Sequence, residues 1–243
     1  MLTTILLAAT TAFTTAKPVW PKGEEATLNF SCRFRGSFAA DGTDACVLRA
    51  TSAYAYRVKL NGQFAGFGPA RAAPGFFRVD EWKLAATNGV NVVEIEACAA
   101  NNECFYFPKQ TPFVQAEVAV NGETKLATGR DFPAFTTERL RKVRFSHQRH
   151  FVEVYRLPFA ERPLALAEQP AKRILPRDYA YPTFEIDDSY RAVSRERVKR
   201  NDKARVRDDA TMAPDGKATP NSYAADEVEE NPFRDVQRLK TVE

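Results

Sequence analysis

Three carboxylates in the strand-forming part of the sequence have the chemistry of a glycosidase, in which an acid and a base flank the bond to be hydrolysed. Glu94 and Glu96 share one face of the segment NVVEIEA, and apolar residues occupy the other face. This alternation predicts a solvated strand face rather than a catalytic pair. Asp80 stands where a strand enters a turn, and we interpret it as a cap.

Glu153 is a further candidate acid. In the segment FVEVYRL, Phe151, Glu153 and Tyr155 lie on one face of an expected strand. A carboxylate between two aromatic rings predicts a structural hydrogen bond or ion pair, so Glu153 and Tyr155 are assigned structural or interface roles. Because the sequence gives Glu153 no evident acidic partner, no residue is assigned a catalytic role.

The stretch LNGQFAGFGPARAAPGFFRVDEW, residues 60–82, combines one arginine with several aromatic side chains. Sugar rings pack their apolar faces on aromatic rings, so this stretch is a candidate binding loop. The candidate ligand-binding residues are Arg71, Phe76, Phe77, Trp82 and, further along the chain, Tyr106. The alternative is that these aromatic residues belong to the core of a sandwich, as most aromatic residues do.

Motifs for a nucleophile, a cofactor or a metal do not occur in the sequence. There is no GxSxG, no P-loop and no GxGxxG, and residues 66–69 lack the following helix that a phosphate site needs. The cysteines form no CxxC, and the only histidines are His147 and His150. We therefore expect neither a cofactor nor a bound metal.

The four cysteines form two pairs whose spacing would allow them to close across neighbouring strands. Cys98 and Cys104 flank one short segment, and Cys32 and Cys46 flank another. An oxidising compartment would permit both disulfides. Each pair is an expected disulfide under that condition, and the connectivity stays open.

The first residues, 1–16, resemble a secretory signal peptide. ILLAATTAF is a short apolar run, and Thr14-Thr15-Ala16 supplies small residues for cleavage. The run is too short to span a bilayer, so no membrane span is expected. These features predict a secreted or periplasmic protein, with a buried first strand as the alternative reading of the same run.

Length and charge narrow the class of protein further. The chain has 243 residues, 44% of them hydrophobic, which is enough to bury a core. Its 35 basic and 31 acidic residues leave a net charge of +4. Because no dense stripe of Lys and Arg alternates with aromatic residues, we expect no nucleic-acid partner.

Short strands separated by turn chemistry dominate residues 26–157. Two segments carry an Asn-Gly pair between strand-like runs, at Asn61-Gly62 and at Asn121-Gly122, and each predicts a tight hairpin. Helical periodicity is nearly absent. The pattern predicts an all-β fold, an antiparallel β-sandwich over residues 17–160.

The character of the sequence changes after the predicted sandwich. Residues 161–190 are punctuated by proline and predict an extended strap. Residues 191–243 are charged and almost free of large apolar side chains, so we expect this segment to be a linker that is disordered on its own.

Several segments in order resemble the N-terminal β-sandwich region of bacterial α-L-rhamnosidases, glycoside hydrolase family 78. They are YRVKLNGQFAGFGPARAAPGFFRVDEWKL, GVNVVEIEA, FVQAEVAVNGETKLATGRDFPAF and HQRHFVEVYRL. The sequence departs from the family pattern at Phe132, where a Trp is common, and only Glu153 and Tyr155 match the closing strand. The resemblance implies a jelly-roll-like fold of the galactose-binding-domain type and, in a complete enzyme, a catalytic (α/α)-barrel with acidic residues.

The resemblance implies that the chain is an accessory module without catalytic residues of its own, which supports or docks a catalytic (α/α)-barrel. The 60–82 stretch would then be a corner loop of the sandwich that braces the neighbouring domain. Two alternatives stay open. One is a stand-alone carbohydrate-binding module for plant or microbial glycans, with Arg71 and the aromatic residues as its site. The other is an autonomous glycosidase that uses Glu153.

Overall fold

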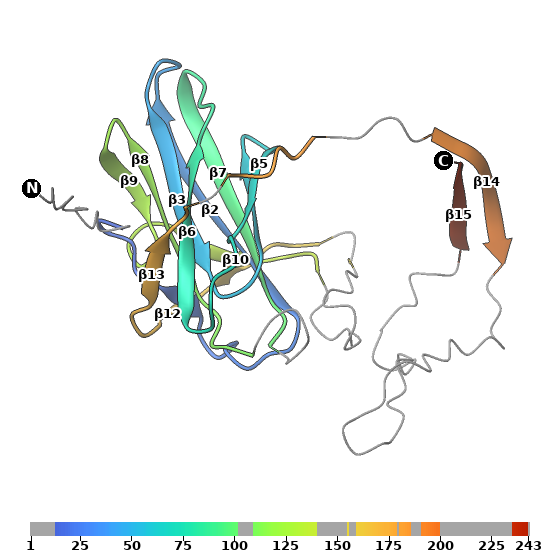
Figure 1. The fold of residues 1–243 in the computed structure, drawn as a ribbon, viewed down its shortest axis with the longest axis horizontal. Helices are drawn as coiled ribbons and strands as arrows, with labels where there is room; N and C mark the ends of the chain where they lie inside the picture. Colours follow the sequence, from blue (N-terminus) through green and yellow to red (C-terminus); the bar gives the residue numbers. More distant parts are fainter. Residues whose placement is uncertain are drawn as a thin grey trace, which may run out of the picture.

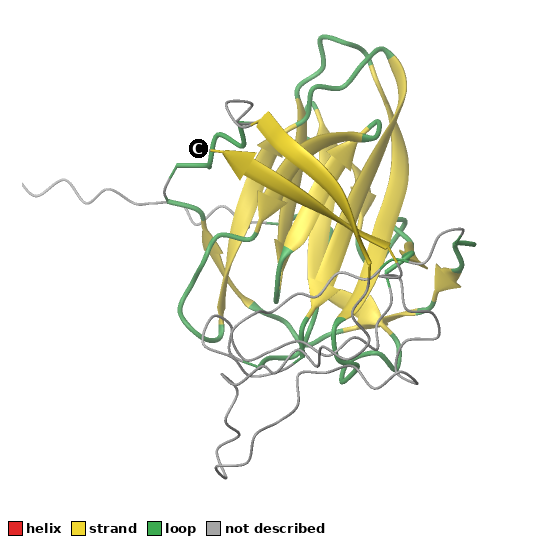
Figure 2. Ribbon diagram, turned by 90° about the vertical axis from the view of Figure 1, so that its right-hand side faces the viewer, coloured by secondary structure: helices red, strands yellow, loops and turns green. Residues whose placement is uncertain are grey.

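The computed structural model of the chain describes residues 13–101, 109–139, 155, 159–178, 180–185, 191–199 and 235–242. These residues form two β-sheets packed face to face, with a separate pair of strands beyond them (Figure 1). Figure 2 shows strands joined by loops throughout the described part, which contains no helix. In particular, the described residues include no helix long and apolar enough to cross a membrane.

The first sheet has six strands in a row and a seventh paired beside them. In spatial order they are β12 (Leu166–Glu168), β1 (Val19–Pro21), β8 (Val114–Val120), β3 (Cys46–Ser52), β6 (Phe76–Lys83) and β13 (Arg173–Pro176), and β9 (Glu123–Ala127) pairs with β8. All of these pairs are antiparallel except β13 with β6, which is parallel.

The second sheet is antiparallel. Its spatial order is β11 (Pro163–Leu164), β10 (Ala134–Thr136), β2 (Phe30–Ala40), β7 (Gly89–Ala99), β4 (Tyr56–Leu60) and β5 (Gln63–Gly68). The two sheets therefore confirm the predicted all-β sandwich.

Alternating side chains build the core between the sheets. Phe34, Val58 and Ile95 point inward from three neighbouring strands of the second sheet, and Leu48 faces them from the first sheet. All four are fully buried, which stabilises the fold by about 1.5–3 kcal/mol for each such side chain. The period of two in these strands is the property that specifies which face lies inside.

The Asn-Gly pairs at residues 61–62 and 121–122 form the tight hairpins that the sequence predicts. Asn61 and Gly62 join β4 to β5 with φ angles of 50° and 80°, and Asn121 and Gly122 join β8 to β9 with 50° and 84°. A two-residue turn that matches the strand twist needs positive φ at both positions, which Asn and Gly tolerate best.

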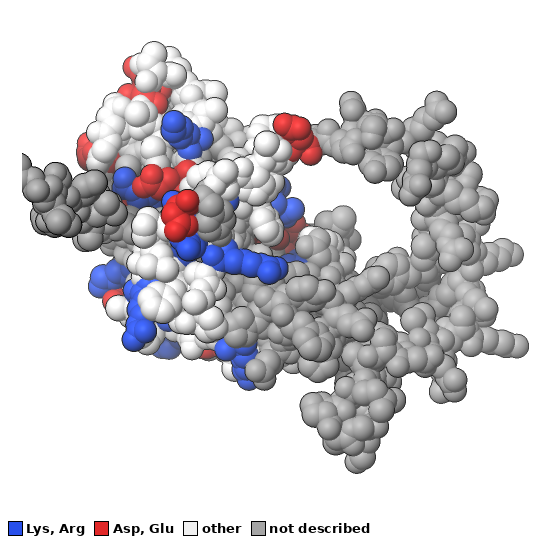
Figure 3. Space-filling model, viewed as in Figure 1, with Lys and Arg blue, Asp and Glu red and all other residues white. Residues whose placement is uncertain are grey.

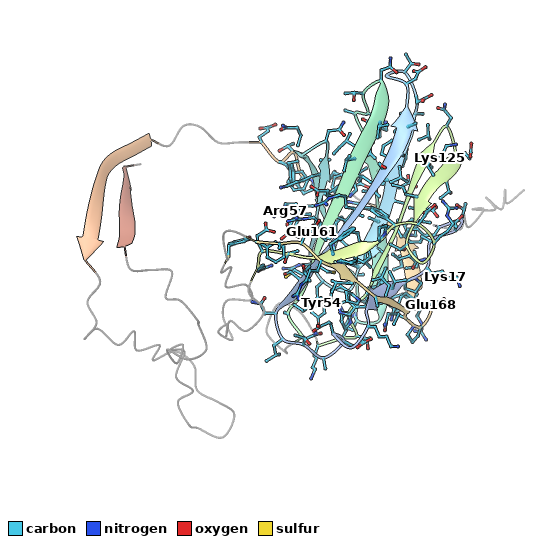
Figure 4. The ribbon with its side chains drawn as sticks, turned by 180° about the vertical axis from the view of Figure 1, so that it is seen from behind. Lys17, Tyr54, Arg57, Lys125, Glu161 and Glu168 are labelled. Atoms are coloured by element: carbon cyan, nitrogen blue, oxygen red, sulfur yellow. The ribbon has the colours of Figure 1, made fainter. Side chains whose placement is uncertain are left out.

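Ion pairs cover the outer face of the second sheet. Glu94 pairs with Arg35 at 2.8 Å and Glu96 pairs with Arg57 at 2.8 Å. Glu161, which precedes β11, reaches Arg35 at 2.6 Å (Figure 4 labels Arg57 and Glu161). The two glutamates lie on the outward strand face, as predicted, but their side chains are only 19% and 13% exposed because the arginines cover them.

The outer face of the first sheet is covered by the N-terminal segment. The Glu117 side chain is fully buried in β8, and its carboxylate accepts hydrogen bonds from the backbone N–H groups of Thr14 (3.0 Å), Thr15 (2.9 Å) and Ala16 (3.2 Å). Arg49 lies 3.5 Å away. Burial alone would raise the pKa of Glu117, but the three N–H donors outweigh it and the pKa is lowered.

The segments assigned to the strap are hydrogen-bonded strands. β11 extends the second sheet, whereas β12 and β13 form the two edges of the first. Lys17, just before β1, pairs with Glu168 of β12 at 2.9 Å (Figure 4). In the charged tail, β14 (Arg191–Lys199) pairs antiparallel with β15 (Asp235–Val242). The predicted signal peptide, domain limits and disorder of the tail stay predictions.

The cysteines differ from the predicted disulfides. Cys32, Cys46 and Cys98 are free and buried, so the predicted Cys32–Cys46 disulfide is wrong. Cys32 lies near the start of β2, while Cys46 begins β3 in the other sheet, after the turn at the far end of β2. Burial raises the pKa of the Cys32 thiol well above its ordinary value. Cys104, the predicted partner of Cys98, lies outside the described residues.

Candidate functional site

A pocket of ≈310 Å³ lies at the end of the sandwich where β5 leaves for β6. We call it the loop pocket. It is lined by Ser52, Ala53, Tyr54, Ala55, Phe67, Pro69, Ala70, Arg71, Ala72, Ala73, Pro74, Phe76, Phe77 and Gln110. The structure thus brings together three of the predicted ligand-binding residues, Arg71, Phe76 and Phe77.

The β3–β4 turn supplies one side of the loop pocket. Tyr54 is buried, and its hydroxyl donates to the carbonyl of Gln110 at 3.1 Å and accepts from the Gln110 N–H at 3.1 Å. The Gln110 side chain donates to the carbonyl of Ala53. These bonds fix the two chain segments to each other, so this side of the pocket is preformed.

Aromatic rings supply the opposite side. Phe77 packs edge-on against Phe113, with ring centroids 4.7 Å apart, and Arg173 of β13 lies 5.5 Å from the Phe76 centroid. Phe67 is 48% exposed and also lines a smaller pocket of ≈110 Å³ on its other side. An exposed ring between two hollows has the form of a stacking platform.

Arg71 is exposed in the 69–75 loop, and its backbone is tied to the strap through Arg78. The Nε of Arg78 donates to the carbonyl of Arg71 at 3.0 Å. Nη1 of Arg78 reaches the Pro176 carbonyl at 2.9 Å and the carboxylate of Asp178 at 2.7 Å. The loop is therefore held at its base while the Arg71 side chain stays at the pocket.

Trp82 does not belong to this pocket, which corrects its prediction as a ligand-binding residue. Its ring is only 7% exposed and packs inside the sandwich, where Nε1 donates to the Tyr56 hydroxyl at 3.0 Å. Tyr181 of the strap lies over it, with centroids 4.7 Å apart. Trp82 stands near the end of β6, whereas Phe76 and Phe77, which line the pocket, stand at its start.

Close packing over Trp82 explains the two glycines of the segment FAGFG. A Cβ on Gly66 would lie 2.6 Å from the Trp82 ring, and a Cβ on Gly68 would lie 2.0 Å from the Asp80 carboxylate. Real side chains do not approach so closely. Only glycine lets β5 lie against β6 at these positions.

We expect Gly66→Ala to lower the free energy of unfolding by about 1–3 kcal/mol, because the new methyl group overpacks the indole of Trp82. Urea unfolding followed by fluorescence measures the change. Gly42→Ala is the matched control, because the nearest atom to its added Cβ is 4.0 Å away. An equal effect of both substitutions would contradict the packing argument.

A buried polar network lies behind the loop pocket. Asp80 is fully buried; it pairs with Arg177 of the strap at 2.8 Å and accepts a hydrogen bond from the Tyr56 hydroxyl. Burial and the Asp80 charge raise the pKa of Tyr56 well above its ordinary value. The prediction of Asp80 as a cap is therefore wrong: its carboxylate joins the two sheets to the strap.

The strap continues past Arg177 across the edge between the sheets. The Arg177 guanidinium lies 3.9 Å from the Tyr181 ring centroid. The ring centroids of Phe184 and of Phe64 in β5 lie 5.2 Å apart. Sequence reasoning missed Arg177, because one arginine in a proline-rich segment resembles any solvated charge.

The remaining predicted residues lie elsewhere or outside the described part. Tyr155 forms an isolated antiparallel bridge with Arg139, and neither residue is among the described residues that line the loop pocket. Tyr106 and Glu153 lie outside the described residues, so their assigned roles stay predictions. Among the described residues, the loop pocket is lined by aromatic, small and amide side chains and Arg71, without a carboxylate. Such a lining is suited to binding a ligand.

The fold and the pocket define a class, a β-sandwich module with a preformed hollow at one end. No protein-family model matches the sequence, and no curated protein matches it significantly. Among solved structures, the chain is similar to the GH78 family rhamnosidase of Bacillus sp. GL1, with 22% identity and a TM-score of 0.59. The match covers 76% of this chain and 22% of that one.

A native α-L-rhamnosidase from Aspergillus terreus is also similar, with 14% identity, a TM-score of 0.49, and coverage of 76% of this chain and 24% of that enzyme. The chain thus spans less than a quarter of the length of either enzyme. The likeness to the Bacillus enzyme confirms, at the level of the fold, the resemblance predicted from the ordered motifs.

Proposed function

We propose that the chain is a non-catalytic accessory module of an α-L-rhamnosidase-like glycoside hydrolase, which supports or docks a catalytic (α/α)-barrel domain. The observation that carries the proposal is the fold shared with the Bacillus sp. GL1 rhamnosidase over 76% of this chain. Because the match takes up only 22% of that enzyme, most of the enzyme lies outside the sandwich.

The buried carboxylates support a structural rather than a catalytic role. A glycosidase needs one carboxylic acid whose pKa is raised, so that it can protonate the leaving group. Burial acts in that direction on Glu117 and Glu138, but hydrogen bonds to both and the nearby Arg33 at Glu138 outweigh it, and the pKa of each is lowered. Asp80 is held by Arg177.

The rim of the loop pocket is our candidate for the docking surface. Phe67 is 48% exposed beside the 69–75 loop, which the motif resemblance assigns to bracing the next domain. An exposed aromatic ring on a preformed rim fits the contact between a sandwich and a barrel packed against it.

The purified chain is expected not to hydrolyse 4-nitrophenyl α-L-rhamnoside, because the buried carboxylates that the structure describes, Asp80 and Glu117, are held in structural contacts. Release of nitrophenol, measured by absorbance, is the readout. As a positive test, residues 13–185 would replace the matched sandwich of the Bacillus sp. GL1 enzyme. We expect an active chimera whose thermal stability falls with Phe67→Asp. Turnover by the isolated chain that is lost in Glu153→Gln would contradict the proposal and favour an autonomous glycosidase.

A second candidate function is carbohydrate binding at the loop pocket. It is favoured by the grouping of Arg71, Phe67 and Phe76 around one preformed hollow, because aromatic faces and a few fixed polar groups are typical of sugar sites. Direct binding of plant or microbial glycans by the isolated chain would support it, whereas the accessory role does not require such binding.

We also propose that the protein is secreted or periplasmic. The support is the apolar run and small residues within 1–16, which are typical of a signal peptide. Expression of the whole sequence with fractionation of the cells, followed by mass spectrometry of the N-terminus, tests both export and cleavage. Cleavage after Ala16 would remove the three N–H groups that bind Glu117, whereas cleavage before Thr14 would keep them.

A further inference from the structure

Three Asn-Gly pairs lie at the same end of the sandwich. Besides the pairs at residues 61–62 and 121–122, Asn88 and Gly89 stand where the chain passes from β6 into β7 (Figure 1). All three asparagines are exposed. In such a pair the backbone nitrogen of the glycine can attack the asparagine side chain, because glycine has no side chain to obstruct the approach. The local sequence allows this reaction at each pair, and the surrounding structure determines which of them reacts.

The side chain of Asn61 is held at both of its polar atoms. Its Oδ1 accepts a hydrogen bond from the Val92 N–H at 2.8 Å, and its Nδ2 donates to Oδ1 of Asn91 at 2.8 Å. Both partners belong to the start of β7. For Cγ of Asn61 to reach the Gly62 nitrogen, the side chain must rotate and break both bonds.

The side chain of Asn121 is held in the same manner by the β2–β3 loop. Its Oδ1 accepts from the Ala45 N–H at 2.9 Å, and its Nδ2 donates to the Asp44 carboxylate at 2.6 Å. A hydrogen bond to a charged group is the stronger kind. The amide of Asn121 is therefore also kept away from the nitrogen of the following glycine.

Asn88 differs from the other two. None of the described residues forms a hydrogen bond with its side chain. The polar contacts of its loop belong to Asn91, which accepts from the Thr87 N–H at 2.8 Å and donates to the Thr87 and Gly89 carbonyls at 2.8 and 3.2 Å. Gly89 pairs with Ala40 at the end of the β2–β7 ladder, where local opening costs the least free energy. The amide of Asn88 can thus turn toward the Gly89 nitrogen without breaking a hydrogen bond of its own.

We propose that Asn88 is a site of spontaneous deamidation in the folded protein. The backbone nitrogen of Gly89 attacks Cγ of Asn88, so that an N–Cγ bond forms and the Cγ–Nδ2 bond breaks. Nδ2 leaves as ammonia and takes up the proton that the Gly89 nitrogen loses. Water then opens the resulting cyclic imide at either carbonyl, which leaves an aspartate or an isoaspartate at position 88.

The product adds a negative charge to an end of the sandwich that is already acidic. Asp41 and Asp44 are acidic residues of the neighbouring β2–β3 loop, and a Cβ on Gly42, between them, would lie 4.0 Å from the backbone nitrogen of Asn88. Figure 3 shows Asp and Glu on the surface at this end, at the top of the view. The deamidated chain should therefore separate from the unchanged chain on ion exchange as a more acidic form.

The test is incubation of the full chain at mildly alkaline pH, followed by tryptic digestion and tandem mass spectrometry. Trypsin places the three pairs in three peptides, 60–71, 84–109 and 110–125, and a sample without incubation provides the baseline. We expect Asn88 to convert about tenfold faster than Asn61 or Asn121, because each of those must first break two side-chain hydrogen bonds. In guanidinium chloride, which unfolds the chain, the three rates should converge.

Matched variants test the protection and the site. Asp44→Ala removes the acceptor of the Asn121 amide and should accelerate conversion of Asn121. Asp178→Ala, which removes an exposed carboxylate of the strap, should leave that rate unchanged. Asn88→Ser should abolish the more acidic form that appears first on ion exchange.

Three results would overturn the proposal or its explanation. Conversion of Asn61 or Asn121 as fast as Asn88 in the folded chain would show that the hydrogen bonds do not select the site. Conversion of Asn88 in guanidinium chloride but not in the folded chain would show that the contacts of Asn91 restrain the loop. An unchanged rate at Asn121 in Asp44→Ala would overturn the protective role of its hydrogen bond.

Discussion

Replacing Asp80 with alanine is expected to lower the free energy of unfolding by about 3–5 kcal/mol, because it leaves the Arg177 guanidinium buried without its carboxylate. The two side chains are 0% and 6% exposed, and their atoms lie 2.8 Å apart. Tyr56 loses its hydrogen-bond acceptor in the same variant. Urea unfolding of the variant and of the unchanged chain measures the difference.

The matched control is Asp178→Ala, which removes the carboxylate of another ion pair between β6 and the strap. Asp178 is 66% exposed in its ion pair with Arg78, so we expect a loss of only about 0–1 kcal/mol. If Asp80→Ala lowered the free energy of unfolding as little as this control, the strap would contribute little to the stability of the sandwich. The role assigned to Arg177 would then be wrong.

The second large effect is expected at the N-terminus. A chain that begins at Lys17 lacks the three N–H donors that bind the Glu117 carboxylate, and Arg49, at 3.5 Å, is the described partner that remains. Removing the segment that covers Glu117 also opens the carboxylate to water. We expect the free energy of unfolding at neutral pH to fall by about 1.5–3 kcal/mol relative to a chain that begins at Phe13, the range for hydrogen bonds to a charged group. Glu117→Gln should destabilise the longer chain more than the shorter one, because the donors to the carboxylate are present only in the longer chain.

The pH dependence gives an independent readout. In the longer chain the pKa of Glu117 is lowered, so its contribution to stability is complete above the ordinary glutamate pKa, about 4.3, and is lost as the pH falls through the folded value. The shorter chain lacks the N–H donors that lower this pKa, so it does not carry this contribution at any pH. The difference in unfolding free energy between the two chains should therefore decrease as the pH falls below about 4.3. A difference that stayed constant from about pH 5 to about pH 2 would show that Glu117 is not its source.

The sequence predicts the sandwich and its hairpins well because both depend on local chemistry. The alternation in β2, β4 and β7 determines which face is apolar, and the Asn-Gly pairs determine where the chain turns. The sequence also predicts part of the loop pocket. The composition of the 60–82 stretch indicates three of its lining residues, Arg71, Phe76 and Phe77.

The rest depends on partners distant in sequence. Asp80 and Arg177 are 97 positions apart, and Glu117 meets Thr14 across 103 positions. Alternation within β6 and β8 shows that a carboxylate faces one side, but not which distant segment covers it. The same reason explains the error at Trp82, since the strap residue Tyr181 that covers it has no local signature.

The docked strap also determines where the chain leaves the sandwich. Phe184 packs against Phe64 of β5, and Figure 1 shows the end of the strap beside this strand. Phe67, at the loop pocket, lies about 10 Å further along β5. A domain that follows in the chain would be tethered to this end of the sandwich through residues 186–243. A glycan chain held in the pocket would meet that domain at an effective concentration that decreases as the tether lengthens. The gain is one of avidity: the sandwich would increase capture of a polymeric substrate without taking part in its cleavage.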